Sequence, residues 1–189
     1  MRSTYQLLLL LGTYCAIPSQ LFSQQSGVDG FTVWQTGHDA QTVQVAPAAG
    51  ERALTQFKDA PVAHVKFIVH EYGELWFPLA NTPASVESAG VDMSASRSVT
   101  VTYQANQDFI LQLRQTGIHG GIQNHVRLPA SKKVTTATIP FTAFSGGLHP
   151  VNLADVAKFN FAFLSNNTRD GYAELYIYHV LVDGYSPRR

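Results

Sequence analysis

Two tyrosines near the end of the chain have the spacing to contact a ligand side by side. Leu175 and Ile177 occupy alternate positions of an expected strand and point to one face, so Tyr176 and Tyr178 point to the other. Aromatic rings stack on the C–H faces of sugars, and a phenol adds a hydrogen-bonding group. The spacing predicts an aromatic surface suited to a sugar. Alternatively, the tyrosines cover a second apolar layer, a loop or a dimer contact.

Polar side chains on other expected strands share the outward register of these tyrosines. They are Gln112 and Arg114, Thr100 and Thr102, and Asn160. Amide, guanidinium and hydroxyl groups are the donors and acceptors that sugar hydroxyls require. Trp76 has the apolar neighbours Leu75 and Phe77, so packing in the core or at the sandwich edge is expected, and ligand stacking is the alternative.

The histidines do not have the spacing of a transition-metal site. His64 and His70 share a strand face, but six residues of extended chain separate them by about 20 Å. His119 and His125 flank the Gly120-Gly121 turn and could approach each other. No pair of histidines is spaced as in a helical zinc motif. We therefore expect solvated or hydrogen-bonded histidines.

Carboxylates for glycosidic bond cleavage are few. Such a reaction needs two carboxyl groups about 5–10 Å apart across a cleft. Glu71 and Glu74 are the one close pair in the sequence, and capping or surface roles suit them better. No Gly-x-Ser-x-Gly motif occurs, and Cys15 is the only cysteine. We expect a protein without catalytic residues.

The composition limits the class of partner. Thirteen Lys and Arg balance thirteen Asp and Glu, 14% of residues are charged and 45% are hydrophobic. A disordered chain would have fewer aromatic residues and more charge. A general nucleic-acid binder would have a basic surplus. We expect no nucleic-acid partner, and a neutral surface of hydroxyl and amide groups favours a neutral polar ligand.

The N-terminal segment has the pattern of a secretory signal peptide. Arg2 precedes a short apolar run over 7–11, and small or turn-forming residues follow up to Ser23. The run is far shorter than the roughly 20 residues that cross a bilayer. We expect cleavage near Ser23, a secreted or periplasmic protein without membrane insertion, and a single domain over 24–189. A buried N-terminal strand or helix is the alternative.

Beyond residue 24 the chain alternates between apolar and polar residues. The clearest runs lie over 64–70, 99–104, 109–114, 159–164 and 174–181, with shorter strands expected near 31–35, 42–46, 74–78, 122–128 and 134–139. A helical turn over 151–157 is too short for a parallel crossover. These strands predict an all-β fold, an antiparallel two-sheet β-sandwich of Greek-key or jelly-roll type.

The alternation also assigns faces within the strands. Phe159, Phe161 and Phe163 share one face and are expected in the core. In the last strand the same period places Leu181 in the core with Leu175 and Ile177, and Val180 on the surface.

Several segments together resemble a galactose-binding-like β-sandwich carbohydrate-binding module. They are Gly90-Val-Asp-Met-Ser, Ser98-Val-Thr-Val-Thr-Tyr, Phe109-Ile-Leu-Gln-Leu, the run from His119 to Ser131, Thr136-Ala-Thr-Ile-Pro-Phe, Val156-Ala-Lys-Phe-Asn-Phe and the closing run from Ala173 to Tyr185. The pattern is similar to family 11 carbohydrate-binding modules and to the complex-I intermediate-associated protein 30 domain. It covers roughly residues 27–185.

The resemblance implies a non-catalytic jelly-roll module that binds a β-glucan or hemicellulose chain on a concave sheet face. The positions that match this face are Tyr176, Tyr178, Gln112, Arg114, His125 and Arg127. The family often carries a structural calcium near the chain termini, and the resemblance implies Asp29 and Asp183 as its ligands. Calcium prefers carboxylate and carbonyl oxygens. A turn role for the two Asp-Gly pairs is the alternative.

We therefore expect a secreted module that binds a neutral polysaccharide or oligosaccharide by stacking and hydrogen bonds. Glycoside hydrolases or a cell-surface assembly are its expected protein partners. The second hypothesis is an extracytoplasmic protein-interaction or assembly sandwich without glycan binding. A glycoside hydrolase-like enzyme is the third.

Overall fold

The chain folds as a sandwich of two antiparallel sheets, as the alternation predicted. The computed structural model describes residues 28, 30–58, 60–80, 89–118, 121–169 and 171–187. The expected signal peptide over 1–23 lies outside these residues. Within the described part of the chain, no helix is long and apolar enough to cross a membrane.

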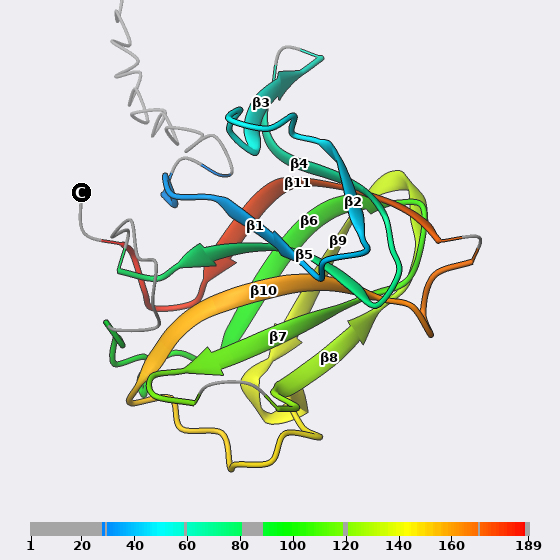
Figure 1. Ribbon diagram of the computed structural model, residues 1–189. Coiled ribbons are helices and arrows are strands. Elements are labelled where there is room, and N and C mark those ends of the chain that lie inside the picture. Colours follow the sequence, from blue (N-terminus) through cyan, green and yellow to red (C-terminus); the bar gives the residue numbers. More distant parts are fainter. Residues whose placement is uncertain are drawn as a thin grey trace, which may run out of the picture.

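The first sheet has five strands, and Figure 1 shows it in front of the second. Its order is β1 (Gln35–His38), β5 (Tyr72–Pro78), β10 (Val156–Leu164), β7 (Phe109–Gln115) and β8 (Asn124–Leu128). β7 and β8 are consecutive in the sequence, whereas the other neighbours in this sheet are far apart, since β10 lies between β5 and β7. One surface of the sheet therefore combines distant parts of the chain.

The second sheet has six strands in all. Its order is β2 (Val43–Ala46), β4 (Ala60–Ile68), β11 (Tyr172–Val182), β6 (Ser98–Ala105) and β9 (Ser131–Pro140), and β3 (Leu54–Phe57) also pairs with β4. A short 3-10 helix, η1 (Phe141–Ala143), follows β9. The alternation did not predict β3.

The core lies between the two sheets. Phe159, Phe161 and Phe163 of β10 are fully buried, as predicted. Tyr103 of the six-stranded sheet meets Phe109 of the five-stranded sheet edge to face, with ring centroids 5.0 Å apart. Because the inner faces pack together in this way, the outer faces of the two sheets point in opposite directions.

The last strand contains a β-bulge that changes its register. Ile177 pairs with Tyr103 and His179 pairs with Thr102, so Tyr178 is the extra residue. Beyond it Val180 is buried, whereas 52% of Leu181 is exposed. The predicted faces of Val180 and Leu181 were therefore wrong, because a bulge reverses the alternation that follows it.

The predicted helical turn over 151–157 is also wrong. Val156 and Ala157 already belong to β10, and the residues before them form a turn. The Asn152 side chain accepts a hydrogen bond from the Ala154 backbone N–H at 3.1 Å. Such local side-chain bonds compete with helical hydrogen bonding and favour a turn.

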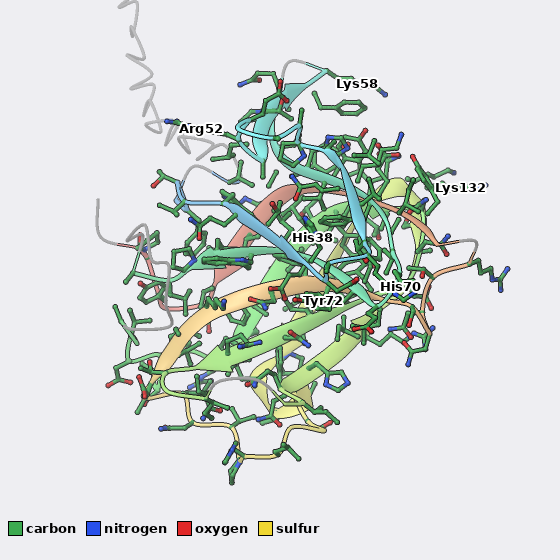
Figure 2. The ribbon with its side chains drawn as sticks, viewed as in Figure 1. His38, Arg52, Lys58, His70, Tyr72 and Lys132 are labelled. Carbon is green, nitrogen blue, oxygen red and sulfur yellow. The ribbon has the colours of Figure 1, made fainter. Side chains whose placement is uncertain are left out.

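Asp39 joins two turns at one corner of the sandwich. Its carboxylate accepts backbone N–H bonds from Gln41 (2.8 Å), Thr42 (2.9 Å), Glu71 (3.0 Å) and Tyr72 (2.9 Å), and also the Thr42 hydroxyl. Figure 2 labels Tyr72 at this corner. Desolvation acts to raise the pKa of Asp39, but the hydrogen bonds from Thr42, Tyr72, Gln41 and Glu71 outweigh it and hold this pKa well below its usual range.

We expect Asp39→Asn to lower the Tm at pH 7 and to weaken its acid dependence. Because folding lowers the pKa of Asp39, its stabilising effect is present above the carboxyl pKa of the unfolded chain, about 4, and is lost as the pH falls below it. Thermal unfolding by circular dichroism between pH 2 and 7 measures this. Asp183→Asn, at an exposed position, is the control when both variants are measured with EDTA present, and equal Tm changes in both variants would contradict the role of Asp39.

Candidate functional site

A row of polar and aromatic side chains crosses the outer face of the five-stranded sheet. Gln35 pairs with Trp76, Trp76 with Asn160, Asn160 with Gln112, and Gln112 with His125. Paired residues point to the same face, and strands about 4.8 Å apart give the row a length of about 19 Å. We call these five residues the cross-sheet row. It aligns an indole, three amides and an imidazole, of which the Asn160 amide is buried.

Trp76 is half-buried on this outer face, so core packing, one of the three roles considered for it, is wrong. Lys158 Nζ lies 4.1 Å from the centroid of the indole ring. This cation–π contact fixes the ring beside the neighbouring strand. The alternation of Leu75 and Phe77 with Glu74 and Trp76 was the sequence signal for an outward Trp76.

Asn160 is the buried centre of the cross-sheet row. It is 0% exposed, although it points away from the core. Its Nδ2 donates to Glu74 Oε2 at 2.8 Å, whereas Asn160 Oδ1 has no hydrogen-bond partner within the described residues. A Cβ atom at Gly37 would lie 2.9 Å from Glu74 Oε1, so the glycine gives Glu74 its room. A buried acceptor without a donor is costly, and such groups often mark functional sites.

Cationic groups lie on both sides of the row. Lys158 and Arg114 are register partners on β10 and β7. On the other side Arg127 pairs with Ile110, and its guanidinium donates to Asp108 Oδ2 from Nη2 (2.8 Å) and Nε (3.1 Å). At the edge, His125 Nδ1 lies 2.8 Å from the Gln123 carbonyl oxygen.

The six ligand-binding residues expected from the sequence therefore do not share one surface. Gln112, Arg114, His125 and Arg127 lie together on the outer face of the five-stranded sheet. Tyr176 and Tyr178 belong to β11 in the six-stranded sheet, on the opposite side of the sandwich. The prediction of one common face was wrong. The parity of a residue, its odd or even position along a strand, decides whether it points inward or outward, but residues with the same parity can belong to different sheets.

Both tyrosines already make contacts with neighbouring side chains. The Tyr176 ring stacks on His64 at 4.2 Å with a 9° interplanar angle, and it also contacts Phe57 at 4.7 Å. Its hydroxyl donates to Glu174 Oε1 at 3.1 Å. The Tyr178 hydroxyl donates to Gln104 Oε1 at 3.2 Å. These rings and hydroxyls therefore do not form the open aromatic surface that the sequence predicted.

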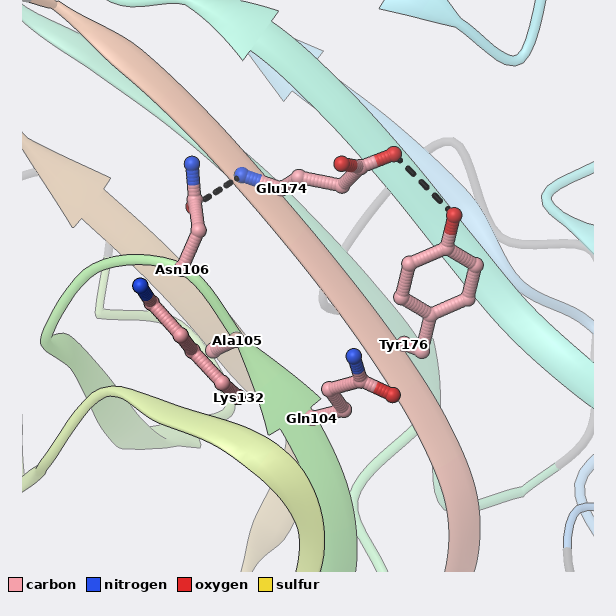
Figure 3. Close-up of a pocket in the computed structure, with 6 residues that line it drawn as sticks. All are labelled: Gln104, Ala105, Asn106, Lys132, Glu174 and Tyr176. Atoms are coloured by element: carbon pink, nitrogen blue, oxygen red, sulfur yellow. Dashed lines mark hydrogen bonds between the residues drawn. The ribbon is translucent and has the colours of Figure 1, made fainter.

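A pocket of about 270 Å³ lies beside Tyr176 (Figure 3). Its lining consists of Gln104, Ala105, Asn106, Lys132, Glu174 and Tyr176. The Glu174 carboxylate lies 3.0 Å from His64 Nε2, and it also accepts the hydroxyls of Tyr172 and Tyr176. The Glu174 carboxylate of the pocket is therefore already bonded to three side chains of the chain.

The pKa shifts agree with this closed network. Desolvation, followed by the hydrogen bond to Glu174, raises the pKa of Tyr176 to about 12. Desolvation acts to raise the pKa of Glu174 as well, but the bonds from His64, Tyr172 and Tyr176 outweigh it and lower this pKa. Both groups keep their charge states near neutral pH, as expected of a structural cluster.

Of the two predicted calcium ligands, only Asp183 lies within the described residues. Asp183 is exposed in a turn that Tyr185 closes by donating its N–H to Val182, with Gly184 at a φ of 72°. Asp29 lies outside the described residues. Among the residues described, no three His, Cys, Asp or Glu side chains gather around one point. The turn role of Asp183-Gly184 is confirmed, and calcium binding stays a prediction.

Glu71 and Glu74 do not face each other across a cleft. Glu71 lies in the exposed turn before β5, where its backbone N–H donates to Asp39. Glu74 points to the outer face of the five-stranded sheet and accepts from Asn160. This placement supports the structural roles expected for these carboxylates.

Comparison with solved structures identifies the fold. A family 11 carbohydrate-binding module of a cellulosomal cellulase of Clostridium thermocellum superposes with a TM-score of 0.61 and 11% identity, over 87% of this chain and 95% of that chain. A family 11 module of the same organism, solved with a β-1,3-1,4-mixed-linked tetrasaccharide, gives a TM-score of 0.53 and 12% identity, over 82% of this chain and 90% of that chain.

A family 30 carbohydrate-binding module gives a TM-score of 0.55 and 9% identity, over 84% of this chain and 85% of that chain. Neither a protein-family model nor a curated protein sequence matches the chain. At these identities the likeness concerns the fold alone. The chain has the galactose-binding-like β-sandwich fold of carbohydrate-binding modules.

Proposed function

We propose that the protein binds a polysaccharide or oligosaccharide on the outer face of the five-stranded sheet, without making or breaking covalent bonds. The observation that carries the proposal is the cross-sheet row of Gln35, Trp76, Asn160, Gln112 and His125. A glycan chain is a linear ligand with apolar ring faces and hydroxyl edges. A line of one aromatic and several amide groups complements both features.

The fold supports the proposal. Structures similar to this chain are carbohydrate-binding modules, and one of them was solved with a bound tetrasaccharide. Paired strands hold the row in register before any ligand arrives, so binding orders few side chains and costs little entropy. This rigidity favours ligand binding over catalysis.

The opposite face suits a ligand less well. Tyr176 is stacked on His64, and its hydroxyl is donated to Glu174. The threonine hydroxyls on that face also pair with each other, Thr100 with Thr138 and Thr102 with Thr136, both at 2.9 Å. A sugar would have to break these bonds to form its own.

We further propose that residues 1–23 direct the chain out of the cytoplasm and that the rest acts as one secreted or periplasmic binding domain. The short apolar run and the small residues before Gln24 support this. Cell-wall polysaccharides lie outside the cytoplasm, so this location agrees with glycan binding. Glycoside hydrolases that act on the same glycan would be its protein partners.

Gln112→Ala is expected to weaken glycan binding about fivefold, because one amide that bonds sugar hydroxyls is lost. Gln104→Ala is the matched control, since Gln104 is also a half-buried strand glutamine but lies on the opposite face. Affinity gel electrophoresis of the mature chain through soluble β-glucans, hemicelluloses and polyuronates measures both variants.

Retardation by at least one polysaccharide, reduced in Gln112→Ala and intact in Gln104→Ala, is the expected result. The reverse pattern would move the site to the pocket of Figure 3. No retardation by any polysaccharide would overturn glycan binding and favour a protein-interaction role.

A further inference from the structure

The charge on the proposed binding face is not neutral. Its described cationic side chains are Arg114, Lys158 and Arg127, and its described carboxylates are Glu74 and, at the edge, Asp108. Asp108 bonds to Arg127 and to the Ala130 N–H, and Glu74 bonds to Asn160. Glu74 and Asp108 therefore lie on the side of the row away from Lys158 and Arg114. The prediction of a neutral ligand came from whole-chain charge, which hides this local asymmetry.

Lys158 and Arg114 stand directly opposite each other on paired strands. Directly opposite side chains on one face have Cβ atoms about 5 Å apart, and two like charges in this position repel. On the other side of Lys158 the register partner is Pro78, which carries no charge. Both cations keep contacts within the chain. Their distinguishing feature is their common position beside Trp76 and Gln112.

Two cations at this spacing fit a carboxylate. A guanidinium binds both carboxylate oxygens through parallel N–H bonds, and an ammonium adds a point charge. Lys158 Nζ already lies 4.1 Å from the indole centroid of Trp76. A sugar ring that contacts Trp76 would therefore hold a substituent on the ring near Lys158 and Arg114, while Gln112 on the same strand as Arg114 bonds to its hydroxyls.

We infer that this face takes an acidic glycan, whose uronic acid units place a carboxylate between Lys158 and Arg114. The inference rests on the proposed function and deepens it by naming the substrate class. A bound carboxylate would place an anionic group between the two cations. Binding should therefore depend on the charge of the glycan as well as on its shape.

The test compares polyuronates with the same polymers after reduction of their carboxyl groups to alcohols. Polygalacturonate, alginate and glucuronoxylan are the probes, measured by isothermal titration calorimetry with the mature chain. We expect binding to at least one native polymer, and about tenfold weaker binding to its reduced form. Binding should also weaken as NaCl rises from 50 to about 500 mM, because salt screens the exposed charges.

Arg114→Gln and Lys158→Gln should each weaken binding to the native polymer about tenfold and weaken binding to the reduced polymer by less. Arg114→Gln keeps the contact between Lys158 and Trp76, so its effect does not depend on movement of the indole. Lys66→Gln, on the outer face of the six-stranded sheet, is the control and should bind as the wild type does. Circular dichroism confirms that each variant is folded.

The outcomes separate the two proposals. Equal binding of native and reduced polymers, or binding to neutral glucans alone, would overturn the acidic ligand and leave glycan binding intact. Retention of full affinity in both Arg114→Gln and Lys158→Gln would also overturn it. Failure of every polysaccharide to bind would reject the proposed function itself.

Discussion

Replacing Phe161 with alanine is expected to lower the free energy of unfolding by about 3–5 kcal/mol. Phe161 is fully buried on the central strand of the five-stranded sheet. Its ring centroid lies 6.1 Å from that of Phe77, 6.2 Å from that of Trp34 and 6.3 Å from that of Phe109. Alanine would remove a ring on which three others pack and would leave a cavity between the sheets.

Urea denaturation followed by circular dichroism measures this loss. Phe57→Ala is the matched control, because Phe57 is only half-buried on β3 and should cost about 1 kcal/mol. Many domains of this size are stable by about 5–15 kcal/mol, so Phe161→Ala removes a large share of the total. Equal costs for the two variants would show that the core is not centred on β10.

Trp76→Ala has the largest expected effect on binding, at least about tenfold. Partly exposed tryptophans are frequent binding hot spots, and a factor of ten corresponds to about 1.4 kcal/mol. Because Trp76 points away from the core, the variant should remain folded. Trp76→Phe keeps an aromatic ring and should bind with intermediate affinity. Isothermal titration calorimetry with the tightest-binding polysaccharide measures both.

Tyr176→Ala is the control for Trp76→Ala, since it removes an aromatic residue from the opposite face. We expect it to leave the affinity unchanged. It should lower the Tm slightly, because His64 and Phe57 lose the ring on which they pack. Loss of binding in Tyr176→Ala with full binding in Trp76→Ala would assign the ligand to the six-stranded sheet.

The sequence predicted the fold class because alternation is a local signal. Phe159, Phe161 and Phe163 point inward as their period-two spacing requires. The same reasoning correctly identified Gln112 and Arg114 as outward residues of one strand. Local parity is therefore reliable wherever a strand is regular.

Parity could not assign the candidate site, since it says nothing about which sheet a strand joins. β5 pairs with β10 through contacts such as Trp76 with Asn160, which are far apart in the sequence. Tyr176 has the same outward parity as Gln112 but lies on the other sheet. The bulge at Tyr178 then reversed the faces of Val180 and Leu181. Only the long-range pairing aligns Trp76 with Gln112 across Asn160 and places Lys158 near Trp76.

The most direct test of the proposed binding face uses the two tryptophans of the chain. The Trp34 indole N–H donates to the Phe31 carbonyl oxygen at 2.7 Å, and only 7% of Trp34 is exposed. Trp76 lies half-buried in the cross-sheet row. A ¹⁵N–¹H spectrum therefore contains one buried and one ligand-facing indole signal, which Trp76→Phe assigns.

On titration with an oligosaccharide of the bound polysaccharide, we predict that the Trp76 indole signal shifts progressively and that the Trp34 signal stays in place. The side-chain amide signal of Gln112 should move with Trp76, and that of Gln104 should not. A spectrum in which the ligand shifts Gln104 while the Trp76 indole and Gln112 remain still would contradict binding on the five-stranded sheet.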